Sequence, residues 1–209
     1  MEKLKNFLKR FDFSFHPVTV FPFLCLLLTY PAMKYLPVKY CYENHLLENF
    51  QLVVILIAFI CCLKAKTDKV FFKSLALVCV ILFLREINCG RTVFFPVAGV
   101  ENAFLPWKEI PYGYLANPVY GIFMAGSGLY FLITKSYKVL FNYALNAEIA
   151  VYNWIFLFLG MILGTLGEKT GNMQLEEMTE TMFYLSLTAL IYLQGFNIKY
   201  IEKTENKNA

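Results

Sequence analysis

Residues 167–181, GEKTGNMQLEEMTET, separate two apolar segments, 147–167 and 180–198. Each segment holds about 20 residues, enough for an α-helix to cross the roughly 30 Å hydrocarbon core of a bilayer. Backbone polar groups in lipid must be satisfied within a segment, and neither segment alternates like a barrel strand, so both are predicted to be helices. The stretch therefore predicts a hairpin of two membrane helices joined by a polar turn.

Four further apolar segments of similar length precede this hairpin: 17–36, 46–64, 70–89 and 114–134. The predicted fold class is all-α, a polytopic membrane protein with a single six-transmembrane-helix bundle over residues 17–198. The first segment is the weakest, because Pro22 and Pro31 interrupt it and proline kinks a helix.

The composition agrees with a membrane location. Charged residues make up 16% and apolar residues 58% of the 209, and the mean hydropathy is +0.53, whereas a soluble domain carries about a quarter charged residues. The net charge of +4 is not gathered in a basic stripe with interleaved aromatic residues, so no nucleic-acid partner is expected. The lipid bilayer is the expected partner.

The positions of Lys and Arg predict the orientation. With both termini inside, thirteen of these residues fall on the inner side and six on the outer side, and such an excess marks the cytoplasmic side. Residues 1–16 are predicted to be a basic interfacial segment, with a short helix in the first ten residues. Residues 199–209 are predicted to be a basic, polar cytoplasmic tail. The expected localisation is a cell or cytoplasmic membrane, with both termini in the cytoplasm.

The longest connection, residues 85–117, lies on the predicted outer side. Pro96, Pro106 and Pro111 prevent a long helix there, yet the segment is rich in aromatic residues, unlike an ordinary solvated loop. Two interpretations stay open: a lid over the bundle, ordered against it, or a simple aromatic belt at the interface.

The candidate site combines charged residues from two outer regions. Arg85, Glu86 and Arg91 end the third apolar segment, while Glu176, Glu177, Glu180 and Tyr184 begin the sixth. Glu177 heads a polar stripe at helical spacing that continues with Thr181, Tyr184 and Thr188. Ionisable groups at membrane depth usually pair, face the interior and mark a site. We therefore expect Arg85 or Arg91 to pair with one of the three later glutamates.

A structural interpretation competes with the site. Carboxylates are favoured in the first turn of a helix by its dipole, so the glutamates from Glu176 onward can simply begin the sixth helix. Gly167 and Gly171 would end and turn the chain, Thr170 would help to cap the next helix, and Glu168 would be solvated.

Several chemistries are excluded or left open. His16 and His45 are the only histidines, so a histidine metal cluster or a paired-histidine haem site cannot be built. No P-loop, G-x-S-x-G or H-E-x-x-H motif is present. No cofactor is evident, although carboxylates could hold Mg²⁺ or Ca²⁺. Of six cysteines, Cys41 and Cys89 lie on the outer side, and both a disulfide and two free thiols stay open.

Small residues predict close helix packing. Gly160 and Gly164 form a G-x-x-x-G step in the fifth segment, and the fourth carries Gly121, Ala125, Gly126 and Gly128. We expect these faces to pack the fourth helix on the fifth. The Gly160/Gly164 face could instead bind a membrane-protein partner. Asn153, Gln194 and Asn197 are expected to be hydrogen-bond partners between helices.

Three functions follow from these features. The first is an outward-facing carboxylate and arginine site that binds or transports a small polar or charged ligand. The second is a membrane-embedded enzyme for a lipid or lipid-linked substrate at the outer leaflet, with Glu86 or Glu177 as general base and Arg91 holding a phosphate. The third is an accessory or assembly subunit of a membrane complex, which a carboxylate cluster facing open water would favour.

Overall fold

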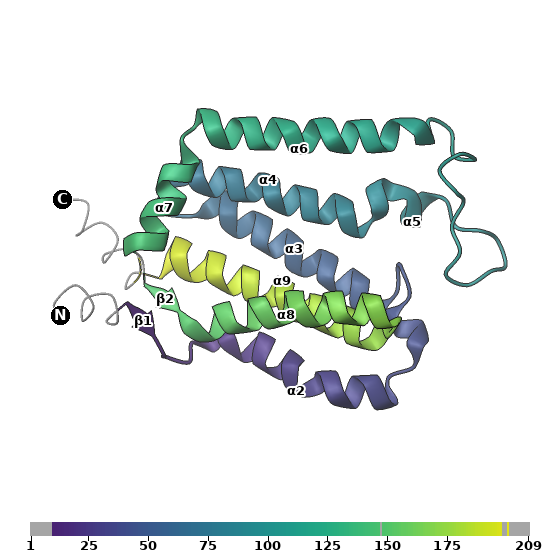
Figure 1. Ribbon diagram of the computed structural model, residues 1–209, viewed down its shortest axis with the longest axis horizontal. Helices are drawn as coiled ribbons and strands as arrows, with labels where there is room; N and C mark the ends of the chain where they lie inside the picture. Colours follow the sequence, from purple (N-terminus) through teal and green to yellow (C-terminus); the bar gives the residue numbers. More distant parts are fainter. Residues whose placement is uncertain (1–9, 147, 198–199, 201–209) are drawn as a thin grey trace.

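The structure, a computed structural model, describes residues 10–146, 148–197 and 200. Six long helices run alternately between two ends of the molecule (Figure 1). They are α2 (Val20–Tyr35), α3 (Leu46–Lys64), α4 (Lys69–Glu86), α6 (Ala116–Ile133), α8 (Val151–Thr170) and α9 (Met173–Phe196). We call the end with residues 65–68, 134–146 and 148–150 the terminal end, and the end with residues 36–45, 87–115 and 171–172 the loop end.

The mostly helical fold is confirmed, and each long helix overlaps a predicted apolar segment. Four of the helical stretches are long and apolar enough to cross a membrane: Pro17–Tyr35, Val38–Lys64, Gly113–Ile133 and Val151–Thr170. The other two long helices, α4 and α9, are more polar. α4 has two lysines near its start and Arg85 and Glu86 at its end, while α9 adds hydroxyl and amide side chains to its glutamates.

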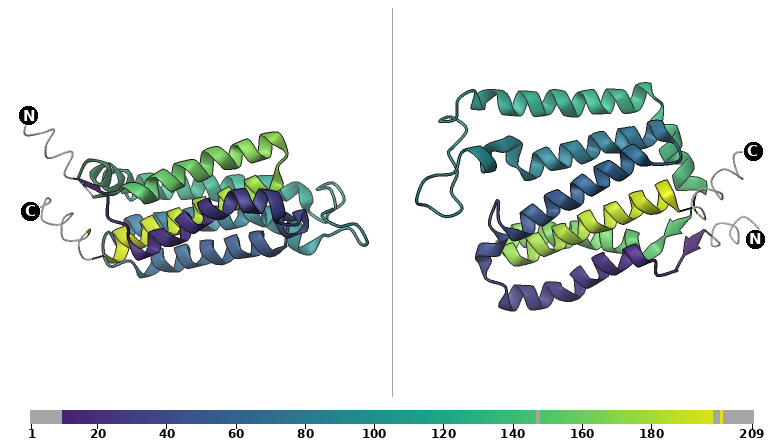
Figure 2. Two further views of the ribbon diagram at one scale, coloured as in Figure 1. Left: turned by 90° about the horizontal axis from the view of Figure 1, so that it is seen from below. Right: turned by 180° about the vertical axis from the view of Figure 1, so that it is seen from behind.

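α9 lies at the centre of the bundle, packed against α2, α3 and α8 (Figure 2). Its polar side chains are shielded by these neighbours, and Met182, Tyr184 and Leu193 on it are almost fully buried. The hydroxyls of Thr181 and Ser186 each donate to the carbonyl four residues earlier, at 2.7 Å. A central position therefore explains how a helix of limited hydropathy fits within an apolar bundle.

The glycine step in α8 packs against α9, and the predicted pairing of the fourth helix with the fifth is wrong. A Cβ on Gly160 would lie 2.7 Å from the Thr179 carbonyl oxygen, and one on Gly167 would lie 2.5 Å from the Glu176 nitrogen. The two backbones approach so closely because these residues have no side chain. The Gly160/Gly164 face is thus already covered within the chain.

α6 lies at the edge of the bundle and packs on α4 and the short helix α7 (Ser136–Asn146). None of its residues is buried, and a Cβ added at Gly121, Gly126 or Gly128 would meet nothing within 4 Å. The sequence could not show this, because a small-residue face looks the same whether or not another helix covers it.

The aromatic segment between α4 and α6 is partly packed. It contains α5 (Arg91–Phe94) and an antiparallel bridge between Pro96 and Phe104, and it extends beyond the loop end of α4 and α6 (Figure 1). The side chain of Asn102 accepts a hydrogen bond of 3.1 Å from the Glu43 backbone N–H, and Ile110 is buried. Phe94 and Tyr112 are exposed, so the aromatic residues are divided between packing and the surface.

At the terminal end, β1 (Phe11–Asp12) pairs in parallel with β2 (Ile149–Ala150). The Tyr200 hydroxyl donates to the Asp12 carboxylate at 3.0 Å, and His16 Nε2 lies 3.2 Å from the same oxygen. Burial and the neighbouring Asp12 carboxylate raise the pKa of Tyr200, so its hydroxyl stays protonated. The predictions for residues 1–9 and for most of the tail, 199–209, lie outside the described residues.

Candidate functional site

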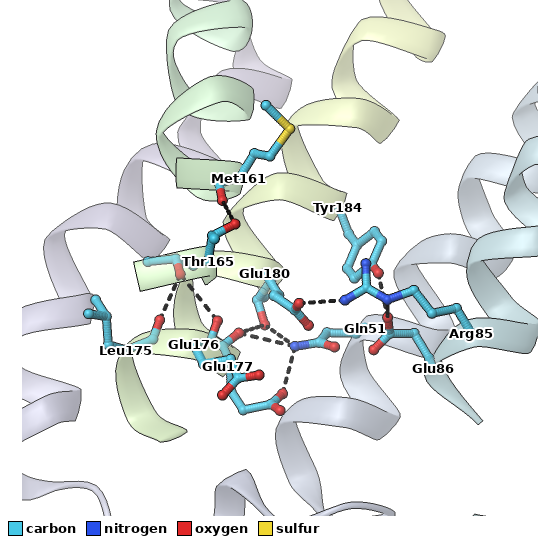
Figure 3. A network of polar contacts seen from close by, with 12 residues as sticks. Gln51, Arg85, Glu86, Met161, Thr165, Leu175, Glu176, Glu177, Glu180 and Tyr184 are labelled. Carbon is cyan, nitrogen blue, oxygen red and sulfur yellow. Dashed lines mark hydrogen bonds and ion pairs between the residues drawn. The ribbon is translucent and has the colours of Figure 1, made fainter. Parts of the chain in front are cut away.

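The predicted charged residues other than Arg91 meet at the loop end, where α3, α4 and α9 come together (Figure 3). We call this group the loop-end acid cluster. Its members are Glu48 and Gln51 of α3, Arg85 and Glu86 of α4, and Glu176, Glu177, Glu180, Thr181 and Tyr184 of α9.

The α8–α9 turn sets the position of the glutamates. Gly171 has a φ of +68°, and the Asn172 backbone N–H donates to the Gly167 carbonyl at 3.0 Å, which closes the end of α8. The Asn172 side chain then accepts a hydrogen bond from the Leu175 backbone N–H and caps α9. The prediction that Glu176 begins a helix is confirmed. Thr170 is not the cap, because its hydroxyl donates to the Leu166 carbonyl within α8.

An ion pair joins α4 to α9. Arg85 Nη2 lies 2.7 Å from Glu180 Oε1, which confirms the predicted pairing of an arginine with one of the three glutamates. Arg85 Nε also lies 3.8 Å from Glu86 Oε1. The Arg85 side chain is 55% exposed and that of Glu86 only 8%, so the guanidinium covers a carboxylate that faces the interior.

The polar stripe of α9 points at the end of α4. Tyr184 is 1% exposed, and its hydroxyl donates to Glu86 Oε1 at 2.5 Å (Figure 3). One turn nearer the loop end, Thr181 accepts a hydrogen bond from the Gln51 amide at 3.2 Å. The hydroxyls that the sequence places at helical spacing after Glu177 thus face α3 and α4.

Gln51 is a central residue of the cluster that sequence reasoning missed. It is fully buried, and its amide nitrogen donates to Glu177 Oε2 at 2.9 Å and to the Glu177 carbonyl at 3.0 Å. Its carbonyl oxygen, Oε1, is buried and has no hydrogen-bond donor among the described residues. The available signal was a polar pair, Glu48 and Gln51, three positions apart in an apolar run.

Glu48 connects the cluster to the outer turns. It is buried, and its carboxylate accepts a hydrogen bond from the Asn44 backbone N–H. The Asn44 side chain in turn donates to the Thr92 carbonyl in α5. The turn before α3 and the segment after α4 are therefore held to each other beside the cluster.

Arg91 does not join the cluster. Its guanidinium lies over the Trp107 ring, 5.8 Å from the ring centroid, and its Nε is buried without an acceptor within the described chain. Within the described part of the chain, no ion pair joins Arg91 to Glu176, Glu177 or Glu180. Of the two predicted arginines, only Arg85 meets the glutamates.

The cluster has a surplus of negative charge. It holds the five carboxyl groups of Glu48, Glu86, Glu176, Glu177 and Glu180 and the single guanidinium of Arg85. Burial raises the pKa of Glu177, which precedes the apolar segment 180–198, and the charges of Glu180 and Glu86 raise it further. Burial likewise raises the pKa of Glu176. At least part of the cluster is therefore held with protons or needs a cation.

A metal ion and a disulfide find little support in this arrangement. In the part of the chain that is described, no three carboxylate, thiol or imidazole groups are placed to hold a metal ion. Cys41 is buried, Cys89 is exposed, and both are free thiols. Of the two interpretations of these cysteines, the structure agrees with two free thiols and not with a disulfide.

The comparisons with known proteins find no match for this chain. No family model matches its sequence, and neither a curated protein nor a solved structure is significantly similar to it. Any function must therefore be argued from the loop-end acid cluster and the cavities of the bundle.

Proposed function

We propose that the chain is a multi-pass membrane protein that spans the bilayer with all six long helices. Large apolar side chains are exposed on helices around the bundle, among them Leu28, Val53, Ile122, Ile133 and Ile162. Lipid is the solvent in which such a surface carries no hydrophobic cost. α4 and α9 can cross with it because their charged residues lie near their ends and α9 is surrounded by helices.

The orientation that we propose places the terminal end in the cytoplasm. The α3–α4 turn and the α6–α7 turn lie at this end. Lys66 and Lys135 lie in these turns, and Lys64, Lys69, Lys73 and Lys138 lie in the helix ends beside them. The thirteen-to-six distribution of Lys and Arg over the whole sequence favours this direction. The loop-end acid cluster then faces the outer side.

For the acid cluster, we propose the binding of a small ligand that carries a cationic N–H group, such as an amine or a guanidinium. The surplus of four carboxyl groups over Arg85 favours positive charge at this position. A ligand of this kind would exchange for the protons that now neutralise part of the cluster.

The observation that carries this proposal is the orientation of Gln51. Its amide hydrogens are both directed toward the Glu177 and Thr181 acceptors, and its buried Oε1 is left without a donor among the described residues. A buried acceptor without a donor costs about 1–3 kcal/mol. The cluster has more hydrogen-bond acceptors than donors. A cation with N–H groups supplies both hydrogen-bond donors and positive charge.

The enzyme hypothesis has less support. It needs Arg91 beside Glu86 or Glu177, whereas Arg91 lies over Trp107, and the two carboxylates are bound by Tyr184 and Gln51. The accessory-subunit hypothesis is favoured by carboxylates that face open water, whereas the carboxylates of Glu48 and Glu86 are buried. Binding is the function that the arrangement favours.

The test compares two cations that differ in N–H groups. The full chain, purified in detergent, is heated with agmatine, which carries an amine and a guanidinium, or with tetramethylammonium, which has no N–H. We expect agmatine alone to raise the unfolding temperature, because a ligand that binds only the folded state stabilises it. Equal shifts with both cations, or no shift with either at matched ionic strength, would contradict the proposal.

A further inference from the structure

A cavity of about 550 Å³ lies at a distance from the acid cluster, between α4, α7, α8 and α9. Its walls are formed by apolar side chains, including Phe72, Leu75, Phe158, Phe183 and Leu187. Its volume falls within the range of roughly 300–1,000 Å³ that small-molecule sites occupy. We call it the terminal-end groove.

The groove is about one leaflet deep. On α9 its lining extends from Phe183 to Gln194, eleven positions along the helix. At 1.5 Å per residue this is roughly 16 Å, about half of the ~30 Å hydrocarbon core. The end of the groove with Gln194, Tyr143 and Glu148 is the terminal end of the bundle.

The groove opens on the outer surface of the bundle. Leu140 of α7, and Trp154 and Phe158 of α8, line it and are each 40% exposed or more. All three rim residues are apolar or aromatic, so in a membrane the opening would meet acyl chains. Tryptophan at such a position is typical of the boundary between lipid tails and head groups.

Several lysines lie at the same end of the bundle as the polar end of the groove. Lys69 and Lys73 lie within one turn of the lining residues Phe71 and Phe72 on α4, and Lys138 precedes Leu140 on α7. All three are exposed, as are Lys64, Lys66 and Lys135 at the same end. Acidic groups of the described chain at this end include Asp68, whose carboxylate accepts a hydrogen bond from the Tyr143 hydroxyl at 2.7 Å, and the buried Glu148.

Gln194 provides a second, independent feature. Its amide nitrogen donates to the Glu148 carbonyl at 3.0 Å, and its Oε1 is buried and has no donor within the described residues. It lines the groove. A hydroxyl group of a ligand that enters here can supply the donor.

We propose that the terminal-end groove binds an acyl chain of an anionic glycerophospholipid from the leaflet at this end, with the head-group phosphate among Lys69, Lys73 and Lys138. Basic residues beside an apolar pocket between membrane helices are the arrangement that recognises such head groups. The inference depends on the proposed membrane location. It does not depend on the ligand of the acid cluster.

Lipid retention measured by native mass spectrometry tests this proposal. The full chain in detergent is offered phosphatidylglycerol or phosphatidylcholine with identical acyl chains, and inorganic phosphate is added as a competitor. We expect retention of phosphatidylglycerol in preference to phosphatidylcholine and no displacement by phosphate. Equal retention of the two lipids, or displacement by inorganic phosphate, would overturn the proposal.

Two variants separate the acyl contact from the head-group contact. Leu140→Trp, at the exposed rim, narrows the opening and should reduce retention of both lipids, whereas Leu166→Trp on the exposed face of α8 should not. Lys69→Gln with Lys73→Gln should lower the preference for phosphatidylglycerol by roughly 25-fold, since each lysine near an anionic surface contributes about fivefold. Lys34→Gln with Lys39→Gln, at the loop end, is the matched control. Unchanged retention in both groove variants would refute the site.

Insertion into vesicles tests the membrane location separately from the lipid site. Failure of the chain to insert into vesicles would contradict the proposed membrane location and the lipid site together. Insertion without lipid preference would overturn the lipid site alone.

Discussion

Arg85 Nη2 lies 2.7 Å from Glu180 Oε1, and this contact joins the end of α4 to the start of α9 across 95 positions of sequence. The same guanidinium lies 3.8 Å from Glu86. It is therefore the positive charge around which the loop-end acid cluster is arranged.

Exchanging the two charges tests this relationship. Arg85→Gln should lower the unfolding free energy by about 0.2–1 kcal/mol, the range for an exposed ion pair, and Glu180→Gln should lower it by less, because this change also removes one of the surplus negative charges. The double variant Arg85→Glu, Glu180→Arg should recover part of the loss, measured by chemical unfolding in detergent. If the double variant loses as much unfolding free energy as the two single variants lose together, the ion pair contributes nothing to stability.

Gln51→Leu should be more costly than the loss of the ion pair. It leaves the Glu177 carboxylate and carbonyl without the donor they now share, and an unsatisfied buried acceptor costs about 1–3 kcal/mol. Val53→Leu, on the exposed side of the same helix, is the control. Equal unfolding temperatures for the two variants would contradict a central role for Gln51.

Alanine substitution of a glycine should lower the stability in α8 and should not lower it in α6. Gly167→Ala places a Cβ 2.5 Å from the Glu176 nitrogen and should destabilise the protein by moving the start of α9. Gly126→Ala meets nothing within 4 Å and should be neutral or gain up to about 1 kcal/mol from helix propensity. Thermal unfolding of both variants decides this, and a neutral Gly167→Ala would argue against the close α8–α9 contact.

Stability should fall as the pH rises, in part because of Glu177. A carboxyl with a raised folded-state pKa gives its full stabilisation below the unfolded-state pKa of about 4.3 and loses it as the pH rises through the folded-state value. Glu177→Gln should therefore reduce the decline in unfolding temperature between about pH 5 and 8. Glu168→Gln, on the exposed turn, should leave the decline as it is. The same slope in both variants would show that Glu177 does not titrate with folding.

Native Cys89 offers a test of topology. It is exposed at the loop end, whereas Cys25, Cys41, Cys62 and Cys79 are buried. A membrane-impermeant maleimide should label intact cells through Cys89 and should not label the Cys89→Ser variant. In that variant, a cysteine at 172 should be labelled and one at 66 only after permeabilisation. Labelling of 66 and 172 from the same side would contradict the proposed crossing.

The sequence allowed much of the helical framework to be predicted, because apolar runs of membrane length are a strong signal. α7 was missed, since its 11 residues are amphipathic and too short for that signal. α9 begins seven residues before its apolar run, because hydrogen bonding and the Asn172 cap define a helix and apolarity does not.

The candidate site was predicted in outline. The stripe from Glu177 to Tyr184 and the charges at the end of α4 indicated correctly which surfaces would meet. Gln51 and the separation of Arg91 from the cluster could not be seen, because they depend on which helices are neighbours. Helix neighbours are set by packing in three dimensions, and a single sequence carries little trace of it.

Cation binding at the loop-end acid cluster is tested by the affinity of the purified protein for agmatine, compared between Glu177→Gln and Glu168→Gln. Both changes remove one carboxyl group from the loop end, but of the two only Glu177 contacts Gln51 within the acid cluster. The proposed binding site predicts that Glu177→Gln weakens binding about tenfold or more, as expected for a lost charged hydrogen bond of ≈1.5–3 kcal/mol, while Glu168→Gln binds like the unmodified chain. Equal affinities in the two variants would contradict it.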